Sequence, residues 1–123
     1  PWDDCKIAFG IDDEKPLFRG LERLVKYGVR PDDILVYMLI GFWEGPKLVA
    51  SDFHRHKKLR EFGCRPYPMP YDRTVPELMG FQRWTTKRLD VVGVTWDEFV
   101  GADYRPERFR RFADQGSFEF DEA

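Results

Sequence analysis

Ile34-Leu-Val-Tyr-Met-Leu-Ile40 is the stretch of sequence that decides the fold. All of its residues are apolar or aromatic, and no polar residue alternates with them. An apolar run of this length is typical of a strand that is buried on both faces, as in a parallel sheet covered by helices. We therefore expect an α/β protein in which Ile34–Ile40 is an inner strand.

A repeated pattern around this stretch favours successive parallel β/α units. Leu24-Val-Lys-Tyr-Gly28-Val-Arg-Pro31 aligns with Leu59-Arg-Glu-Phe-Gly63-Cys-Arg-Pro66. Each copy is typical of a helix end, followed by a left-handed glycine and an Arg-Pro that leads into the next element. We expect strands over 6–9, 34–40 and 65–71 and helices over 16–27, 51–62 and 74–89. Three prolines without a backbone N–H predict that the last strand lies at an edge of the sheet: Pro66, Pro68 and Pro70.

Composition excludes several classes of protein. The chain has 123 residues, of which 42% are hydrophobic and 34% charged, so a disordered tail is not its main content. Its net charge of −2 offers no global attraction to nucleic acid or to an anionic membrane. The longest apolar run, Ile34–Phe42, is about half of what a transmembrane helix needs, and no signal-peptide pattern is visible. Cys5 and Cys64 are too few for a disulfide framework, which predicts a reduced, cytoplasmic protein.

The histidines and the basic clusters favour solvent-exposed surfaces. His54 and His56 are two residues apart on a predicted helix, so they cannot bind one metal ion together, and we expect both at the surface. Residues 54–60 and 105–111 are rich in Arg and Lys. We expect solvated helix faces there, balanced by acidic residues elsewhere, and nucleic-acid binding is the weakest functional hypothesis. Thr74-Val-Pro-Glu77 and Thr95-Trp-Asp-Glu98 are predicted capping boxes.

Candidate site residues follow the predicted strands at their carboxyl ends, where ligands bind in parallel α/β folds. Gly41 would allow a ligand to approach the backbone closely. Phe42, Trp43 and Tyr71 could stack on a flat ring, while Glu44 and Asp72 could accept hydrogen bonds from hydroxyls or an amine. The alternative is that the segments after the strands are only turns and packing contacts, with an ion pair between Asp72 and Arg73.

Several of these segments together carry a resemblance to a family. They are Trp2-Asp3-Asp4, Val36-Tyr-Met-Leu-Ile-Gly-Phe42, Tyr67-Pro-Met-Pro-Tyr71 and Phe81-Gln-Arg-Trp84. In order and spacing they resemble the carboxyl-terminal half of a radical S-adenosylmethionine (SAM) protein, over about residues 1–100. The resemblance implies half of a partial (β/α)6, TIM-like barrel over 1–100 and a carboxyl-terminal helix or tail over 101–123.

The resemblance also implies a cofactor-binding set. Tyr37-Met-Leu39-Ile-Gly41-Phe-Trp-Glu44 overlays the family's loose Gly-x-Ile-x-Gly-x-x-Glu pattern, which packs on the adenine of SAM. Leu39, Gly41 and Glu44 fit this pattern, whereas Tyr37 departs from its first glycine. By the same resemblance, Asp3 or Asp4 would contact the ribose, and Met69 to Tyr71 would lie near the adenine.

The family's Cys-x-x-x-Cys-x-x-Cys loop, which holds the [4Fe–4S] cluster, has no counterpart in this sequence. The resemblance therefore implies an enzyme only if an upstream half holds the cluster, so the chain by itself is expected to be inactive. The expected partner is that missing amino-terminal half, within a longer protein. The alternative is a truncated, non-enzymatic interaction module that binds itself or another protein, for example a phage or mobile-element inhibitor of a larger protein.

Overall fold

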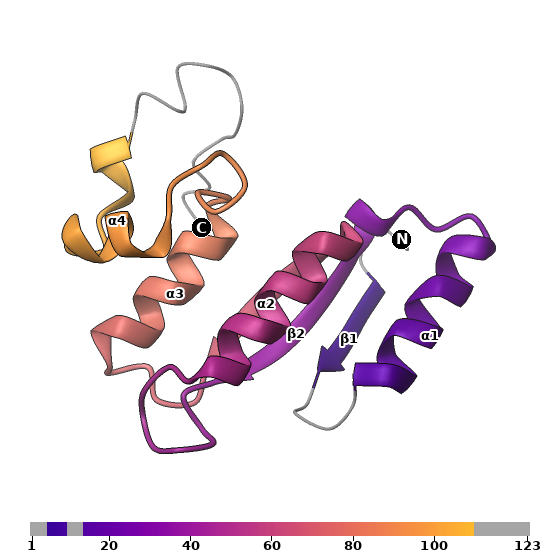
Figure 1. The fold of residues 1–123 in the computed structure, drawn as a ribbon, viewed down its shortest axis with the longest axis horizontal. Coiled ribbons are helices and arrows are strands. Elements are labelled where there is room, and N and C mark those ends of the chain that lie inside the picture. Colours follow the sequence, from indigo (N-terminus) through magenta and orange to yellow (C-terminus); the bar gives the residue numbers. More distant parts are fainter. Residues whose placement is uncertain (1–4, 10–13, 110–123) are drawn as a thin grey trace.

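The computed structural model describes residues 5–9 and 14–109. Strands and helices alternate along the chain, as the repeated pattern predicts, and two short 3-10 turns cover Pro31–Asp33 and Pro106–Phe109 (Figure 1). In chain order the elements are β1 (Cys5–Phe9), α1 (Glu14–Lys26), β2 (Ile34–Ile40), α2 (Ala50–Phe62), β3 (Arg65–Pro70), α3 (Pro76–Thr86) and α4 (Trp96–Gly101).

The three strands form one parallel sheet in the order β1-β2-β3. Cys5 of β1 pairs in register with Ile34 of β2, and Leu39 of β2 pairs with Met69 of β3. The carboxyl ends of β2 and β3 therefore meet at one edge of the sheet. The α/β class and the parallel arrangement predicted from the apolar run and the repeat are confirmed.

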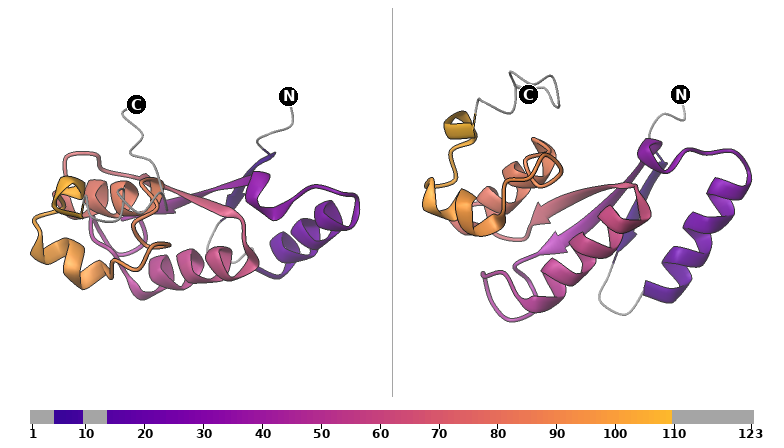
Figure 2. Two further views of the ribbon diagram at one scale, coloured as in Figure 1. Left: turned by 90° about the horizontal axis from the view of Figure 1, so that it is seen from above. Right: turned by 45° about the horizontal axis from the view of Figure 1, so that its top comes forward.

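The prediction that β2 is buried on both faces is wrong. Burial alternates along the strand: Ile34, Val36, Met38 and Ile40 are buried, whereas the intervening side chains are only half-buried. The buried face packs under the helices, and α1 and α2 lie on the same side of the sheet (left view of Figure 2). We call the other face the open face. It carries the half-buried or exposed side chains of β2 and β3, which are Leu35, Tyr37, Leu39, Arg65, Tyr67 and Met69.

The edge position predicted for the last strand is confirmed, and its hydrogen bonding explains the prolines. The Tyr71 amide, just after β3, donates to the Ile40 carbonyl of β2 over 3.0 Å. Since successive amides of a strand point to opposite sides, Pro66, Pro68 and Pro70 occupy the positions whose N–H would point away from β2. The outer edge of β3 therefore lacks these donors, and the Gln82 side chain of α3 bonds the Pro68 carbonyl there over 3.1 Å.

Aromatic side chains join the helices into one core. Phe53 of α2 meets Phe81 of α3 with ring centroids 5.3 Å apart, and Trp96 of α4 lies 5.4 Å from both Phe81 and Trp84. The Thr95 capping box is confirmed, because its hydroxyl accepts the Glu98 amide at 3.1 Å and its amide donates to the Glu98 carboxylate at 2.9 Å. Among the described residues, no helix has the length and apolarity needed to cross a membrane.

Candidate functional site

The carboxyl edge of the sheet holds a small pocket of about 210 Å³ between the ends of β2 and β3. Its position agrees with the sequence prediction, because both segments that follow the two strands contribute to it. Its lining consists of Gly41, Phe42, Gly45, Pro46, Tyr71 and Asp72.

Aromatic rings form one wall of this pocket. The Phe42 and Tyr71 ring centroids are 4.8 Å apart, and those of Phe42 and Trp43 are 5.0 Å apart. Phe42 is 44% exposed and Tyr71 64% exposed, so both retain free ring surface. Large exposed aromatic side chains at a strand end provide the apolar faces on which a flat ligand ring can stack.

Gly41 is required by the turn that leaves β2. Its φ is +73°, a left-handed conformation that costs an L-residue about 1–2 kcal/mol. A Cβ at this position would also collide with the Leu78 side chain of α3. The glycine therefore allows α3 to pack closely on the strand end. The sequence suggested that Gly41 would let a ligand approach the backbone closely, but the Leu78 side chain occupies that space.

Asp72 is held by a local turn at the mouth of the pocket. Its carboxylate accepts the Thr74 amide at 2.9 Å and the Thr74 hydroxyl at 2.6 Å. These bonds to Thr74 lower the pKa of Asp72 below its ordinary value. The predicted capping box at Thr74 is wrong: the residue before α3 is Val75, which has no side chain that can cap, and the Glu77 carboxylate accepts the Leu48 amide instead.

The structure brings together only some of the residues predicted from the resemblance. Leu39 and Met69 are register partners on the open face, next to Gly41 and Tyr71 at the strand ends. Glu44 is exposed in the loop after β2 and does not line the pocket. Asp3 and Asp4 lie outside the described residues.

Sequence reasoning missed a buried ion pair beneath the site, since Arg55 was expected to be solvated. Asp52 and Arg55 of α2 bond each other, with side chains 0% and 2% exposed. Asp52 also accepts the Val49 amide at 3.0 Å, and the Gly41 amide bonds it too. Arg55 donates to the Leu39 carbonyl at 2.7 Å, and its guanidinium lies 5.9 Å from the Trp43 ring centroid. The pair thus ties the loop after β2 to the first turns of α2.

Burial dominates the electrostatics of this pair. Loss of hydration raises the pKa of Asp52, although the Val49 amide and Arg55 act in the opposite direction. Loss of hydration likewise lowers the pKa of Arg55, opposed by Asp52. The pair positions the backbone of the candidate site and is shielded from any ligand. An acidic residue near the start of α2 is a recognisable cap signal, but nothing in the sequence marks Arg55 as buried.

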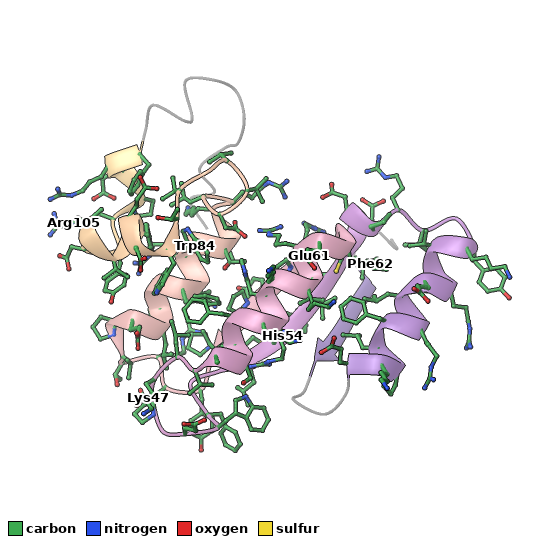
Figure 3. The ribbon with its side chains drawn as sticks, in the orientation of Figure 1. Lys47, His54, Glu61, Phe62, Trp84 and Arg105 are labelled. Carbon is green, nitrogen blue, oxygen red and sulfur yellow. The ribbon has the colours of Figure 1, made fainter. Side chains whose placement is uncertain are left out.

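A second charged cluster corrects the prediction for His56. Its side chain is buried, stacks on Trp84 at a centroid distance of 5.0 Å, and bonds Asp90 at 2.8 Å. Arg60 donates to both Asp90 oxygens, at 2.6 and 3.1 Å. Burial is the largest single effect on the pKa of Asp90 and raises it, but the contacts with His56 and Arg60 together outweigh burial, so the pKa lies below its ordinary value. His54 is exposed as predicted and bonds Glu14 of α1 at 2.8 Å (Figure 3).

These ion pairs also determine how much of the basic segment 54–60 is exposed to solvent. Arg55 is buried against Asp52, and Arg60 is bound to Asp90. The segment therefore does not present the continuous solvated face that was expected. With its arginines engaged by acids, it also provides less positive surface for a nucleic-acid phosphate backbone than its sequence suggests.

Cys64 does not fit an iron–sulfur cluster. Its thiol is buried, bonds the Leu59 carbonyl at 3.4 Å, and burial raises its pKa to about 11. Cluster ligands are thiolates, which such an environment disfavours. Across the described residues, no group of three or more His, Cys, Asp or Glu side chains is arranged to hold a metal ion.

Comparison with protein-family models, with curated proteins and with solved structures finds no match to this chain.

Proposed function

We propose that this chain is the carboxyl-terminal half of a radical SAM-type barrel and contributes part of the wall that binds the adenosine end of SAM. The observation that carries the proposal is the one-sided cover of the parallel sheet. All-parallel sheets normally have both faces covered. Here the face formed by Leu35, Tyr37 and Leu39 remains half-exposed, as expected for the interior face of a barrel whose other half is absent.

The two outer strands of the sheet support an arrangement in which the missing half pairs along β1 and β3 is the last strand. The outer edge of β3 lacks the donors that Pro66, Pro68 and Pro70 cannot provide, so it suits the last strand of an incomplete barrel. β1 is the opposite edge strand of the sheet. Strands from an upstream half would therefore pair along β1, and their side chains would cover the open face.

The chemistry of the pocket suits an adenosine group. Phe42 and Tyr71 offer exposed ring faces for a purine, and the low pKa of Asp72 keeps an acceptor available for hydroxyl or amino hydrogens. The indole N–H of Trp43, beside Phe42, is buried and has no acceptor among the described residues. SAM with its cluster supplies the radical chemistry of such a protein. The residues of this chain would bind and orient the adenosine, and the cluster would be held by the other half.

The test is binding of S-adenosylhomocysteine, which carries the same adenosine end, measured by chemical-shift perturbation in NMR. We expect saturable, weak binding that is reduced about tenfold in Tyr71→Ala, because stacking on an aromatic residue contributes about 1–3 kcal/mol. Tyr27→Ala is the matched control, since Tyr27 is 80% exposed and follows α1, away from the pocket.

Absence of saturable binding to the wild-type protein, or equal losses in both variants, would overturn the proposed adenosine site. The second candidate function, a protein-interaction module, would then be favoured. Met69 and Tyr71 support that candidate, because they are 43% and 64% exposed at one end of the open face. Exposed aromatic and methionine side chains are enriched at protein interfaces.

A further inference from the structure

A second pocket of about 210 Å³ lies at the amino end of β3, and the candidate site lies at the carboxyl ends of the strands. Three arginines line it: Arg60 of α2, Arg65 of β3 and Arg88 of the turn that follows α3. None of the described residues that line it is acidic. Its volume is well above the roughly 10–15 Å³ that a cavity needs to hold one water molecule, so it has room for a small oxyanion.

Arg60 forms a fixed wall of this pocket. From the last turn of α2 it reaches α3, where its guanidinium donates to the Thr85 carbonyl at 3.0 Å. The same guanidinium binds both oxygens of Asp90, at 2.6 and 3.1 Å, so its charge is already balanced. Arg60 therefore sets the position of the carboxyl end of α3 relative to α2.

Arg88 is placed by an unusual backbone conformation. It follows α3 with φ +60°, and its amide donates to the Thr85 carbonyl at 3.0 Å. A left-handed conformation is uncommon for arginine and costs about 1–2 kcal/mol relative to an ordinary one. The turn continues with the Leu89 amide on the Trp84 carbonyl at 3.0 Å, which fixes where the Arg88 side chain leaves the backbone.

Arg65 enters from the sheet. It is the first residue of β3 and belongs to the open face, beside Tyr67 of the same pocket. Its positive charge helps to lower the pKa of Asp33, after the larger effect of Arg30. Thr86, at the end of α3, adds an exposed hydroxyl to the lining.

We propose that this pocket binds a phosphate-type oxyanion, with Arg65 and Arg88 as its charged ligands and the Thr86 hydroxyl as a further donor. The arginine guanidinium is a planar fork of donors that matches the oxygens of a phosphate group. The bound group is inorganic phosphate or the phosphate of a small ester, which share this chemistry. The site lies at the amino end of β3, whereas Tyr71 and Asp72 follow its carboxyl end, and the proposal does not depend on the proposed function.

Titration of the full chain with inorganic phosphate, followed by ³¹P NMR, tests the proposal. Arg88→Asn removes the charge but keeps a residue that tolerates φ +60°, so the turn is preserved. We expect the dissociation constant for phosphate to rise about tenfold in Arg88→Asn and in Arg65→Gln, as for loss of one charged hydrogen-bond donor. Arg105→Gln is the matched control, because Arg105 lies beyond α4, away from α2 (Figure 3), and should change the constant by less than about twofold.

A parallel titration with glycerol phosphate separates the two sources of the anion. Tighter binding of the ester identifies a phosphate ester as the ligand, and equal or weaker binding identifies inorganic phosphate. The proposal is overturned if phosphate does not saturate the wild-type protein below about 10 mM, where binding energy falls under about 3 kcal/mol. It is also overturned if Arg88→Asn, with an unchanged circular dichroism spectrum, binds as the wild type does, or if Arg105→Gln loses as much affinity as Arg88→Asn.

Discussion

Replacement of Arg55 by methionine should be among the most destabilising single substitutions in this chain. The substitution preserves much of the side-chain volume but leaves the Asp52 carboxylate, which is 0% exposed, without its charged partner. Removing one partner of a buried ion pair costs about 3–5 kcal/mol. The Leu39 carbonyl also loses the donor that bonds it at 2.7 Å.

This free energy corresponds to a large shift of the melting temperature. Unfolding entropies of about 2.1 cal/mol/K per residue give about 0.26 kcal/mol/K for 123 residues. A loss of 3–5 kcal/mol therefore lowers Tm by about 12–19 °C, as measured by circular dichroism or calorimetry. Arg19→Met is the matched control, since Arg19 is exposed on α1, and its effect should stay within about 0.5 kcal/mol.

The pH dependence provides an independent check of the cause. Arg55 lowers the pKa of Asp52 against the larger, raising effect of burial, so its removal raises that pKa further. A group whose pKa is higher in the folded than in the unfolded state loses its stabilising effect as pH rises. The penalty of Arg55→Met should therefore be smallest below about pH 4, near the unfolded pKa of aspartate, and should grow as pH rises above it.

A double-mutant cycle with Asp52→Asn completes the test. Because the two side chains bond each other, the double variant should be less destabilised than the sum of the single variants by at least about 0.5 kcal/mol. Additive effects, or an Arg55→Met variant that melts within a few degrees of the wild type, would refute the view that this pair holds the loop after β2.

Two further predictions concern the other charged cluster and the strand end. Asp90→Asn should destabilise the protein at neutral pH, because the pKa of Asp90 is lower in the folded state than in the unfolded state. The contribution of the ionised Asp90 to stability is therefore present above about pH 4 and is lost as pH falls further. Urea unfolding at neutral and acidic pH measures this, and a difference from the wild type that does not depend on pH would contradict it. Gly41→Ala should cost more than Gly45→Ala in thermal unfolding, since both have positive φ but only the Gly41 Cβ meets Leu78. The strain alone costs about 1–2 kcal/mol, so equal losses would show that the contact with Leu78 is unimportant.

Local features of the sequence were sufficient to predict the three strands and the first two helices in order, whereas the helix expected over 74–89 ends at Thr86 and α4 was indicated only by its capping box. The apolar run predicted β2 as Ile34–Ile40, with the bounds that the structure has. The prolines of β3 predicted an edge strand, because a missing N–H is a property of the residue itself, wherever the chain places it. In the same way, glycine was expected after α2, and Gly63 adopts φ +101° there.

The candidate site was predicted only in part. Its place at the carboxyl edge follows from parallel topology, so Gly41 and Tyr71 could be expected to meet. The role of Gly41 could not, because the close approach comes from Leu78, a residue far along the chain. The capping box at Thr74 was wrong because α3 begins one residue later than expected, after Val75, and the Glu77 carboxylate accepts the distant Leu48 amide.

The sequence by itself determined the α/β class, the order of the elements and the edge position of β3, because these depend on apolar runs, turn residues and missing donors. Only the tertiary structure decided which side chains are covered. Apolarity shows that Tyr37 favours burial, but whether another layer lies over it depends on segments distant in sequence. For the same reason Arg55 and His56, polar by type, are buried, because the fold brings the Leu39 carbonyl to Arg55 and the Asp90 carboxylate to His56.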